Sequence, residues 1–151
     1  LLFDFLLMIY ITPADPSDSE AIRNLEKEAH GEDVTSRYDA ALISRFGYAY
    51  IAKEKGTIIG AITAWRARNG EIKINDWVVH PKHQHQGIGE KLYRRLIIET
   101  KGNIILSLVD VKNTASMKAH QKLGFKAVTK IQDAYHQSQG EEQILWKLEN
   151  E

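Results

Sequence analysis

The sequence predicts an α/β (α+β) fold in which helices cover a mixed, mostly antiparallel sheet. Three observations support this prediction. Patterns typical of strands alternate with helical patterns along the 151 residues, and the Asn69-Gly70 pair is a strong signal for a hairpin between neighbouring strands. Farther along, a β-branched run that ends at Pro81 leads through glycines into a helical pattern. The length is that of one domain with one adequate core, which we expect over residues 8–150.

The first strand is expected at residues 9–12. Ser17 or Asp18 can cap the helix that follows, and Gly31 marks its end. The apolar residues on one face of this helix are Ile22, Leu25 and Ala29.

A second helix is expected from about residue 36 to residue 45, before Gly47. It is expected to bury Tyr38, Leu42 and Phe46. Three strands follow, and turn residues separate them. These strands are expected at residues 48–53, 57–66 and 71–79, with turns at Gly56 and Asn69-Gly70.

The second half of the chain is expected to add two helices and three strands. One helix covers residues 87–100, and the other follows Asn113, which is a good N-cap residue. The strands are expected at residues 104–111, 126–131 and 143–148. The predicted order is β-α-α-β-β-β-α-β-α-β-β, with seven strands, about four helices and a parallel pair formed by the fourth and fifth strands.

Charge and composition exclude several classes of protein. The 20 Lys and Arg residues balance the 20 Asp and Glu residues, which argues against a nucleic-acid partner. The absence of cysteine excludes disulfides, thiolate metal sites and a cysteine acyl intermediate, and it fits a cytoplasmic location. No segment has the length and apolar character of a membrane span, so no membrane partner is expected.

Residues 1–7 are apolar except for Asp4, and they precede Met8. The run is too short to span a bilayer, and it lacks the basic flank and cleavage site of a signal peptide. We expect an upstream or cloning-derived extension, with Met8 as the natural first residue. The alternative is an apolar extension that packs on the domain or on a second copy, so the protein is expected to be a monomer or a homodimer.

The loop before the helix at residues 87–100 has the features of a phosphate-binding site. Gln84, Gly87 and Gly89 lead into this helix, whose first N–H groups have no internal partner and whose dipole favours negative charge. The two glycines allow positive φ and a close approach of a ligand to the backbone. The loop lacks the sequence signatures of a nucleotide P-loop and of a dinucleotide-binding fold. A pyrophosphate-bearing cofactor is therefore expected, and a purely structural glycine turn is the alternative.

Three histidines in this region follow a His-x-x-His-x-His pattern from His80 to His85. The spacing is similar to that of a metal-binding tract. However, the loop carries no acidic residue, and two of the histidines flank the expected phosphate site. We therefore expect no metal.

Two segments in the same order resemble the GCN5-related N-acetyltransferase family. Gln84-x-x-Gly87-x-Gly89 resembles the family's Gln/Arg-x-x-Gly-x-Gly/Ala signature. Asn113-x-x-Ser116, a helix and then Leu-Gly-Phe at 123–125 resemble the family's second half. The resemblance is specific over residues 72–128 and only architectural outside them. It implies the acyl-CoA N-acyltransferase fold, in which the fourth and fifth strands splay apart.

The resemblance implies acetyl-CoA as cosubstrate and direct transfer of its acetyl group to a primary amine in a ternary complex. In the family, the pantetheine arm pairs with strand backbone, and a backbone N–H at the position of Val79 stabilises the oxyanion. The pyrophosphate meets the start of the helix, and Lys91, Arg94 and Arg95 can approach the 3′-phosphate. The positions that match cofactor-binding residues are Trp77, Val78, Val79, Gln84, His85, Gln86, Gly87, Ile88, Gly89, Glu90 and Asn113.

Two positions depart from the family's pattern for proton transfer. The family often has a tyrosine seven residues after the asparagine, which protonates the leaving thiolate. Here this residue is His120, which can act as a general acid or can be a packed helix residue. A glutamate often precedes the pantetheine-binding stretch, and here Asn75 matches it, with Asp76 beside it. Asp76 is the candidate base if a bulge re-aims it, and a water chain is the alternative.

The acceptor is expected to be a small-molecule amine or a peptide N-terminus. In the family, the first two helices and the loop before the last strand line the acceptor pocket, here about residues 29–38 and 132–140. Glu28, Glu32 and Asp33 can attract a cationic amine, or they can simply form charged surface. Two other functions stay open: an acyl-CoA-binding sensor or catalytically feeble domain, and an interaction domain that pairs through residues 1–7 or the last strand.

Overall fold

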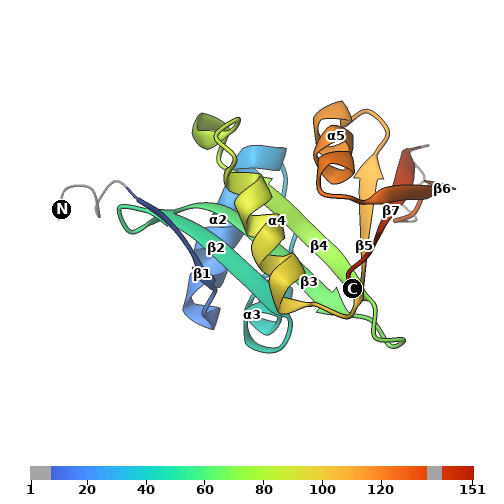
Figure 1. Cartoon of the computed structure of the whole chain (residues 1–151). Coiled ribbons are helices and arrows are strands. Elements are labelled where there is room, and N and C mark those ends of the chain that lie inside the picture. Colours follow the sequence, from blue (N-terminus) through green and yellow to red (C-terminus); the bar gives the residue numbers. More distant parts are fainter. Residues whose placement is uncertain (1–7, 136–140) are drawn as a thin grey trace. The chain divides into compact units, whose positions relative to one another are not determined.

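The computed structural model describes residues 8–135 and 141–151 (Figure 1), so residues 1–7 and part of the loop expected at 132–140 lie outside the described residues. None of the helices in the described ranges is both long and apolar enough to cross a membrane. The α-helices are α2 (Ser19–His30), α3 (Arg37–Phe46), α4 (Ile88–Glu99) and α5 (Thr114–Lys122), and the short 3₁₀ helices are η1 (Pro16–Asp18) and η2 (Pro81–His83). The strands are β1 (Ile9–Pro13), β2 (Tyr48–Glu54), β3 (Thr57–Arg66), β4 (Ile72–Val79), β5 (Ile104–Asp110), β6 (Lys126–Gln132) and β7 (Glu142–Glu149).

The seven strands form one sheet in the order β1-β2-β3-β4-β5-β7-β6. β1 pairs with β2, β2 with β3, β5 with β7 and β6 with β7, and all four pairs are antiparallel. β4 and β5 are parallel, and their register joins Ile72 to Ile105 and Lys73 to Leu106. The predicted element order and the predicted mixed sheet are therefore confirmed.

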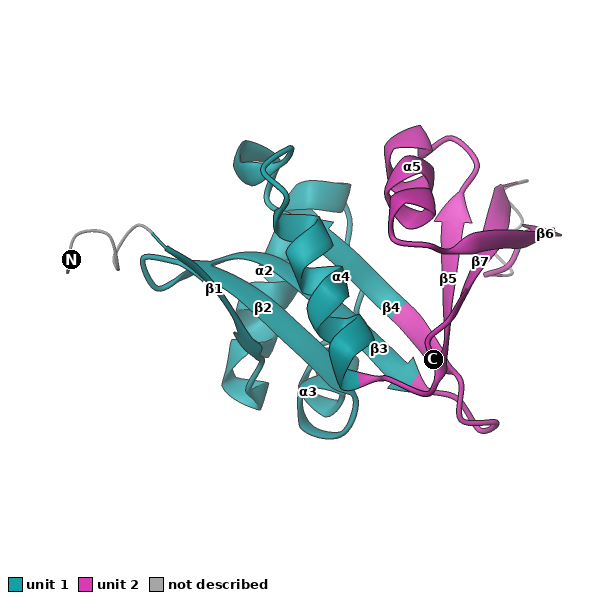
Figure 2. Cartoon of the chain, in the orientation of Figure 1, with its two compact units in different colours: residues 1–65, 75–99 teal, residues 66–74, 100–151 magenta. Residues whose placement is uncertain are grey.

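The chain forms two compact units (Figure 2). Unit 1 comprises residues 1–65 and 75–99, and unit 2 comprises residues 66–74 and 100–151. Unit 1 thus contains α2, α3, α4 and most of the first four strands, whereas unit 2 contains α5 and the last three strands. The prediction of a single domain over residues 8–150 stays a prediction.

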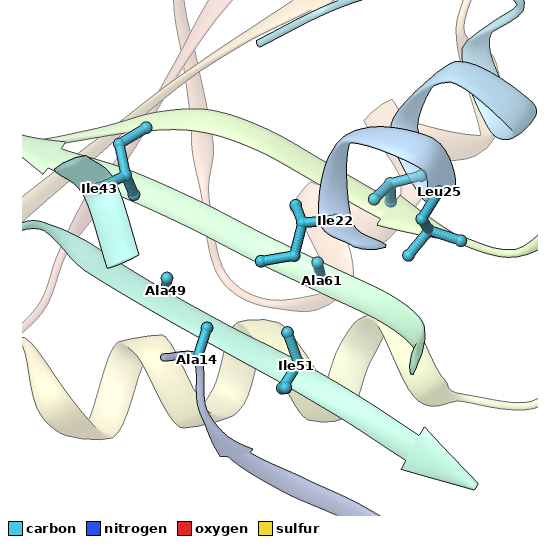
Figure 3. Close-up of a cluster of buried hydrophobic side chains, with 8 residues drawn as sticks. Ala14, Ile22, Leu25, Ile43, Ala49, Ile51 and Ala61 are labelled. Atoms are coloured by element: carbon cyan, nitrogen blue, oxygen red, sulfur yellow. The ribbon is translucent and has the colours of Figure 1, made fainter. Parts of the chain in front are cut away.

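In unit 1, α2 and α3 cover one face of the strands, and α4 covers the other face (Figure 3). The close approach of α4 depends on Gly60 of β3. A Cβ added at Gly60 would lie 3.0 Å from Cδ1 of Leu92 and 3.3 Å from Cγ2 of Ile88. On the opposite face, the buried apolar core consists of Ala14, Ile22, Leu25, Ile43, Ala49, Ile51, Ala61 and Val78.

The chain enters α2 through a cap that differs from the predicted one. The Asp15 carboxylate accepts a hydrogen bond from the Ser17 N–H at 2.9 Å, and Asp18 Oδ2 accepts one from the Asp15 N–H at 2.8 Å. Asp18 makes no side-chain cap bond to α2 itself. Asp18 therefore occupies the predicted N-cap position of α2, but its carboxylate closes the capping box of η1 instead of capping the α-helix. The apolar face predicted for α2 is confirmed.

α3 buries Ala40 and Ile43 rather than the residues that the sequence predicted. Tyr38, Leu42 and Phe46 are 79%, 46% and 76% exposed. The helix is apolar on more than one face, so its pattern predicts a helix but does not select the buried side. The face with the small Ala40 side chain lies inward, because it allows the helix to lie close to the strands.

The hairpin loop at Asn69-Gly70 consists of three residues, 68–70, between the hydrogen-bonded Ala67 and Glu71. An Asn-Gly pair predicts a loop of two residues. The Ala67 N–H donates to the Glu71 carbonyl at 2.7 Å, and the Gly70 N–H donates to the Ala67 carbonyl at 2.9 Å. Gly70 has a φ of 88°. A turn followed by a left-handed residue is typical of three-residue hairpin loops. The predicted position of the turn is confirmed, and its length is corrected.

Both ends of α5, in unit 2, lie where the sequence predicts them. The Asn113 side chain accepts a hydrogen bond from the Ser116 N–H at 3.1 Å and caps the first turn. At the other end, Gly124 has a φ of 95°, and its N–H donates back to the last turn. The Phe125 N–H donates to the His120 carbonyl at 2.9 Å. These two bonds form a Schellman motif, which ends the helix and directs the chain into β6.

Candidate active site

The connection between β4 and α4 contains two residues with left-handed backbone. His85 has a φ of 63°, and Gly87 has a φ of 79°. Positive φ is uncommon for a residue with a side chain, so His85 marks a specifically shaped turn. Backbone N–H groups that converge at such turns can form a concave site for an anion. α4 begins directly after this turn, at Ile88.

The two glycines of the loop have different roles. A Cβ added at Gly87 would meet nothing within 4 Å, whereas a Cβ at Gly89 would lie 2.9 Å from Cζ2 of Trp77. Trp77 Nε1 donates a hydrogen bond to the Gly89 carbonyl at 2.9 Å. The indole also stands edge-on to Tyr93, with ring centroids 4.9 Å apart. Gly89 therefore admits the Trp77 ring, a role that the sequence did not predict, and Gly87 is the glycine that borders open space.

The start of α4 fits an anionic ligand. The Lys91 N–H donates to the Gly87 carbonyl at 3.1 Å, so this bond closes the first turn of α4, which the N–H groups of Ile88 and Gly89 begin. They lie at the positive end of the helix dipole. Ile88 is buried, so it would meet a ligand through its backbone only. These donors suit a pyrophosphate group.

Gln84 stabilises this loop through its side chain. Its Nε2 donates to the Val79 carbonyl at 3.2 Å, which ties the loop back to the end of β4. His85 and Gln86 are exposed. Of these three predicted cofactor ligands, Gln84 thus already has a structural role, and a direct contact with a cofactor stays a prediction for all three.

The basic residues of α4 differ in their surroundings. Arg94 Nη2 lies 2.7 Å from Glu90 Oε1 in an ion pair within the helix. Arg95 lies over the ring of Tyr50, 5.2 Å from its centroid. Lys91 is exposed. Arg95 is thus held against β2, and Lys91 is the residue of the three that is best placed to meet a phosphate.

The histidines near η2 pair with carboxylates from other elements. His80 Nε2 lies 3.1 Å from Glu28 Oε1, and His83 Nε2 lies 3.4 Å from Glu54 Oε2. These pairs connect η2 to α2 and β2. In the part of the chain that the structure describes, no three potential ligands form a group that could hold a metal ion.

Trp77 and Val79 turn their backbone N–H groups toward the edge of β4 that faces away from β3. The His80 N–H donates to the Ile59 carbonyl of β3 at 2.7 Å, and successive N–H groups of a strand point to alternate edges. The Val79 and Trp77 N–H groups therefore point the other way, while Val78 packs in the core. This is the edge that pantetheine is predicted to use.

Asn75 and Asp76 reach the same side of β4. Asn75 Nδ2 donates to Thr35 Oγ1 and to Thr63 Oγ1, both at 3.1 Å. Asp76 Oδ1 lies 3.1 Å from Nε2 of His30, at the end of α2. Consecutive residues of a regular strand point to opposite faces, so β4 departs from regular alternation here. This departure is the condition under which Asp76 was expected to act as the base.

Two residues of α2 that sequence reasoning missed complete this group. Glu26 is 1% exposed, and its Oε2 accepts a hydrogen bond from Thr35 Oγ1 at 2.7 Å. Burial, with a smaller contribution from neighbouring Asp76, raises the pKa of Glu26 to about 8. Hydrogen bonding to Asp76 raises the pKa of His30. One feature of the sequence could have indicated that Glu26 is buried. It follows Ile22 by four residues, so both side chains lie on the apolar face of α2. We call the following residues the Asp76 cluster: Glu26, His30, Thr35, Asn75 and Asp76.

His120 is buried inside unit 2, with 1% of its surface exposed. Its Nδ1 lies 2.7 Å from the Ser116 carbonyl, which can only accept, so Nδ1 carries the proton and Nε2 accepts from Ser107 Oγ at 3.0 Å. The ring also packs against Phe125 and Trp146. Burial lowers the pKa of His120, and the bond to Ser116 opposes this shift. This geometry matches the packed-residue alternative, and the acid role stays a prediction.

The profile of the acetyltransferase (GNAT) family matches residues 19–125. The chain belongs to this family. Solved structures share its fold. The ribosomal-protein-S18-alanine N-acetyltransferase from Escherichia coli has 23% identity and a TM-score of 0.81, over 95% of this chain and 94% of that chain. The Salmonella typhimurium protein yncA, solved with its cofactor acetyl-CoA, has 21% identity and a TM-score of 0.81, over 95% of each chain.

Two curated relatives are similar in sequence to part of the chain. The L-amino acid N-acyltransferase MnaT from Escherichia coli (strain K12) is 33% identical over 82 residues, which are 50% of this chain and 48% of the relative. The L-methionine sulfoximine/L-methionine sulfone acetyltransferase from Salmonella typhimurium is 31% identical over 88 residues, 54% of this chain and 52% of the relative. The match thus spans about half the length of each relative.

Proposed function

We propose that this protein is an acetyl-CoA-dependent N-acetyltransferase that moves an acetyl group to a primary amine in a ternary complex. One observation carries the proposal. In the loop that the family profile covers, Gly87 is left-handed, borders open space and directly precedes the N-terminus of α4. This arrangement supports binding of the cofactor pyrophosphate. The direction of the Trp77 and Val79 N–H groups, away from β3, supports a place for the pantetheine arm beside this loop.

Acetyl-CoA supplies an activated acyl thioester. Transfer forms a C–N bond between the amine nitrogen and the acetyl carbon and breaks the C–S bond, so no side chain has to form a covalent bond. The protein contributes by aligning the two substrates. The Val79 N–H is our candidate donor to the developing oxyanion, and Asn113, the cap of α5, is a further candidate cofactor contact.

Three proton transfers accompany this reaction: the ammonium nitrogen loses one proton before it attacks and a second as the amide forms, and the leaving thiolate gains one. A primary amine has a pKa of about 10.4 in water, so a base has to take a proton from the ammonium form. We assign this role to Asp76, whose side chain is 13% exposed and is held by His30. The leaving thiolate takes up a proton, either from His120 or from water. His120 can supply one only as an imidazolium, which its burial opposes.

We propose that the acceptor carries an α-amino group. Both curated relatives are named for action on amino acids, and one structural neighbour is named for a protein alanine. Free amino acids and peptide N-termini share this chemistry. The Asp76 carboxylate would attract the cationic form of such an amine.

Calorimetric titration with acetyl-CoA, with free coenzyme A as the comparison, is the first test. We expect a dissociation constant in the micromolar range. Release of free thiol would then be followed with methionine sulfone, other free amino acids and an N-terminal peptide, with a polyamine as the contrasting acceptor. Absence of binding at millimolar acetyl-CoA would refute the proposal.

A second candidate function is an acyl-CoA-binding sensor. The buried, neutral His120 favours it, because this residue stands where the family often has a tyrosine acid. A sensor would bind acetyl-CoA with micromolar affinity and would release no thiol with any of these amines. Turnover with one amine would exclude it.

A further inference from the structure

Glu26 is a buried carboxyl group that the proposed reaction does not yet use. It lies in the middle of α2, on the side that packs against the strands, and is 1% exposed. Burial of a carboxylate without compensating partners is strongly unfavourable. An apolar residue would serve the packing of α2 better, so the presence of a carboxyl group at this position calls for another explanation.

The contacts of Glu26 are those of a neutral carboxylic acid. Thr35 Oγ1 donates to its Oε2 at 2.7 Å. The buried Oε1 has no hydrogen-bond partner among the described residues. The Asp76 carboxyl group is a neighbour of Glu26, and hydrogen bonding to it contributes to the raised pKa of Glu26. A proton on Oε1 resolves this conflict, because it turns two repelling acceptors into a donor and an acceptor.

Asp76 is thus held from two sides. The Glu26 carboxyl group neighbours it from the middle of α2, and His30 Nε2 lies 3.1 Å from Oδ1 and 3.2 Å from Oδ2 at the end of α2. The charged or titratable groups that act on His30 are Asp76, Glu26 and Glu32. His30 has a side chain that is 37% exposed, so it connects the buried carboxyl pair with solvent.

We infer that Glu26 is a positioning residue for acetyl transfer: it keeps its proton, donates it to Asp76 as a hydrogen bond, and so holds Asp76 in place to accept the proton of the amine. This inference rests on the proposed function. The proton that Asp76 takes from the ammonium passes to water, which returns Asp76 to its carboxylate form, and the N–H of His30 again donates to it. Glu26 itself neither gains nor loses a proton in the cycle.

Two variants of Glu26 separate this role from packing. Glu26→Gln keeps the shape, accepts from Thr35 and donates an amide N–H to Asp76, but it cannot ionise. Glu26→Leu keeps most of the volume and removes the donor. We expect Glu26→Gln to retain kcat within about twofold at pH 7, and Glu26→Leu to lower kcat at least tenfold with KM for acetyl-CoA unchanged. Equal kcat values and equal pH profiles for the two folded variants would overturn the inference.

A second measurement does not depend on turnover. The imidazole of His30 is followed by NMR across pH 5 to 10 in the wild type and in both variants, with His30→Asn to assign its signals. We expect a second inflection near pH 8 in the wild type, where Glu26 ionises, and its absence in Glu26→Gln. Superimposable wild-type and Glu26→Gln curves would show that Glu26 holds no such proton. Lack of turnover together with the second inflection would refute the proposed function but not the protonated state of Glu26.

Discussion

At the residue scale, the contact between Trp77 and Gly89 determines how β4 and α4 meet. The indole donates to the Gly89 carbonyl at 2.9 Å and occupies the space that a side chain at residue 89 would need. The carbonyl belongs to the first turn of α4, so the bond also fixes the N–H groups of that turn. Trp77 therefore positions the anion site through its side chain, while its backbone faces the edge of β4.

We predict that Gly89→Ala weakens acetyl-CoA binding about tenfold, which corresponds to about 1.4 kcal/mol. The new Cβ would lie 2.9 Å from the ring, which has to move and thereby loses its bond to the loop. Calorimetry measures the affinity. In a Trp77→Leu background the ring is absent, so the same substitution is expected to have a much smaller effect. If the losses in binding free energy from Gly89→Ala and Trp77→Leu were fully additive, the contact between residue 89 and the Trp77 ring would not be the cause.

Glu26 should make the stability of the protein depend on pH. Its pKa is raised from 4.5 to about 8 in the folded state, so the folded state binds this proton more tightly than the unfolded state. The stability that results is fully present below about pH 4.5 and is lost as the pH rises through about 8. Glu26→Gln cannot ionise, so at pH 8.5 we predict that this variant is more stable than the wild type by up to roughly 5 kcal/mol, at about 1.4 kcal/mol for each pH unit between the two pKa values.

Urea unfolding at pH 5, 7 and 8.5 tests this dependence. The difference in the free energy of unfolding between Glu26→Gln and the wild type should grow with pH. A difference that stays constant across the three pH values would show that Glu26 is ionised in the folded protein.

His120 should contribute to stability whatever its part in catalysis. We predict that His120→Ala lowers the free energy of unfolding by about 2–3 kcal/mol, because it leaves a cavity and a buried Ser107 hydroxyl without its partner. A double-mutant cycle with Ser107→Ala should show a coupling of about 1 kcal/mol. Since burial lowers the pKa of His120, stability should also fall as the pH drops below 6.5.

The same variant tests the catalytic role. If His120 is the acid, His120→Ala lowers kcat far more than it lowers cofactor affinity, and an unchanged kcat would remove His120 from the mechanism.

The sequence predicted the glycine turn before α4 and the cap of α5 better than it predicted the Asp76 cluster, for a physical reason. Gly87 and Asn113 act through backbone geometry that is local in the chain, so neighbouring residues reveal it. Glu26 and Asp76 are 50 residues apart and meet only because α2 packs on β4 where the strand departs from regular alternation. No local pattern encodes such a contact, although the position of a glutamate on the apolar face of a helix indicates an unusual buried carboxyl group.

At the element scale, α3 shows that the periodicity of apolar residues predicts a helix but does not determine which face of the helix is buried. Apolar residues recur on two sides of this helix, and the exposed side carries Tyr38 and Phe46. Its end restricts the choice further, because a Cβ at Gly47 would lie 2.8 Å from the Ala64 carbonyl of β3. The chain therefore turns into β2 in close contact with β3. Sequence alone showed the helix and its final glycine, but the buried face depends on this tertiary contact.

The cap of α5 allows a structural role to be separated from a role in binding. Asn113→Ala removes the bond to the Ser116 N–H, and we predict a loss of about 1 kcal/mol in stability. Asn113→Asp caps equally well and should keep the stability. If Asn113 also donates to the cofactor through its amide, Asn113→Asp will weaken acetyl-CoA binding at least fivefold in calorimetry. Wild-type affinity in the aspartate variant would limit Asn113 to capping.

At the scale of the whole molecule, the family fold was predictable because each element carries its own signals and the order of the elements along the chain matches that of the family. The acceptor was not predictable. In the family, its pocket draws on segments far apart in the sequence, here about residues 29–38 and 132–140, and part of the second segment lies outside the described residues. Local signals thus specify the fold and the cofactor loop, whereas specificity depends on how distant segments meet.

Cofactor binding should stabilise the folded chain as a whole, and Gly87 allows this to be tested. Acetyl-CoA at 100 times its dissociation constant adds about 2.7 kcal/mol to the free energy of unfolding, which raises Tm by roughly 5–10 °C for a chain of this size. Gly87→Glu places a carboxylate beside the proposed pyrophosphate site, so we predict that thermal unfolding of this variant no longer responds to acetyl-CoA.

Gly70→Glu is the matched control, because Gly70 also has positive φ and open space at its Cβ position but lies in the β3–β4 turn. The backbone strain should lower Tm similarly in both variants, and only Gly70→Glu should keep the ligand-induced rise. Loss of the rise in both variants would mean that strain, and not the position of Gly87 at the anion site, abolishes binding.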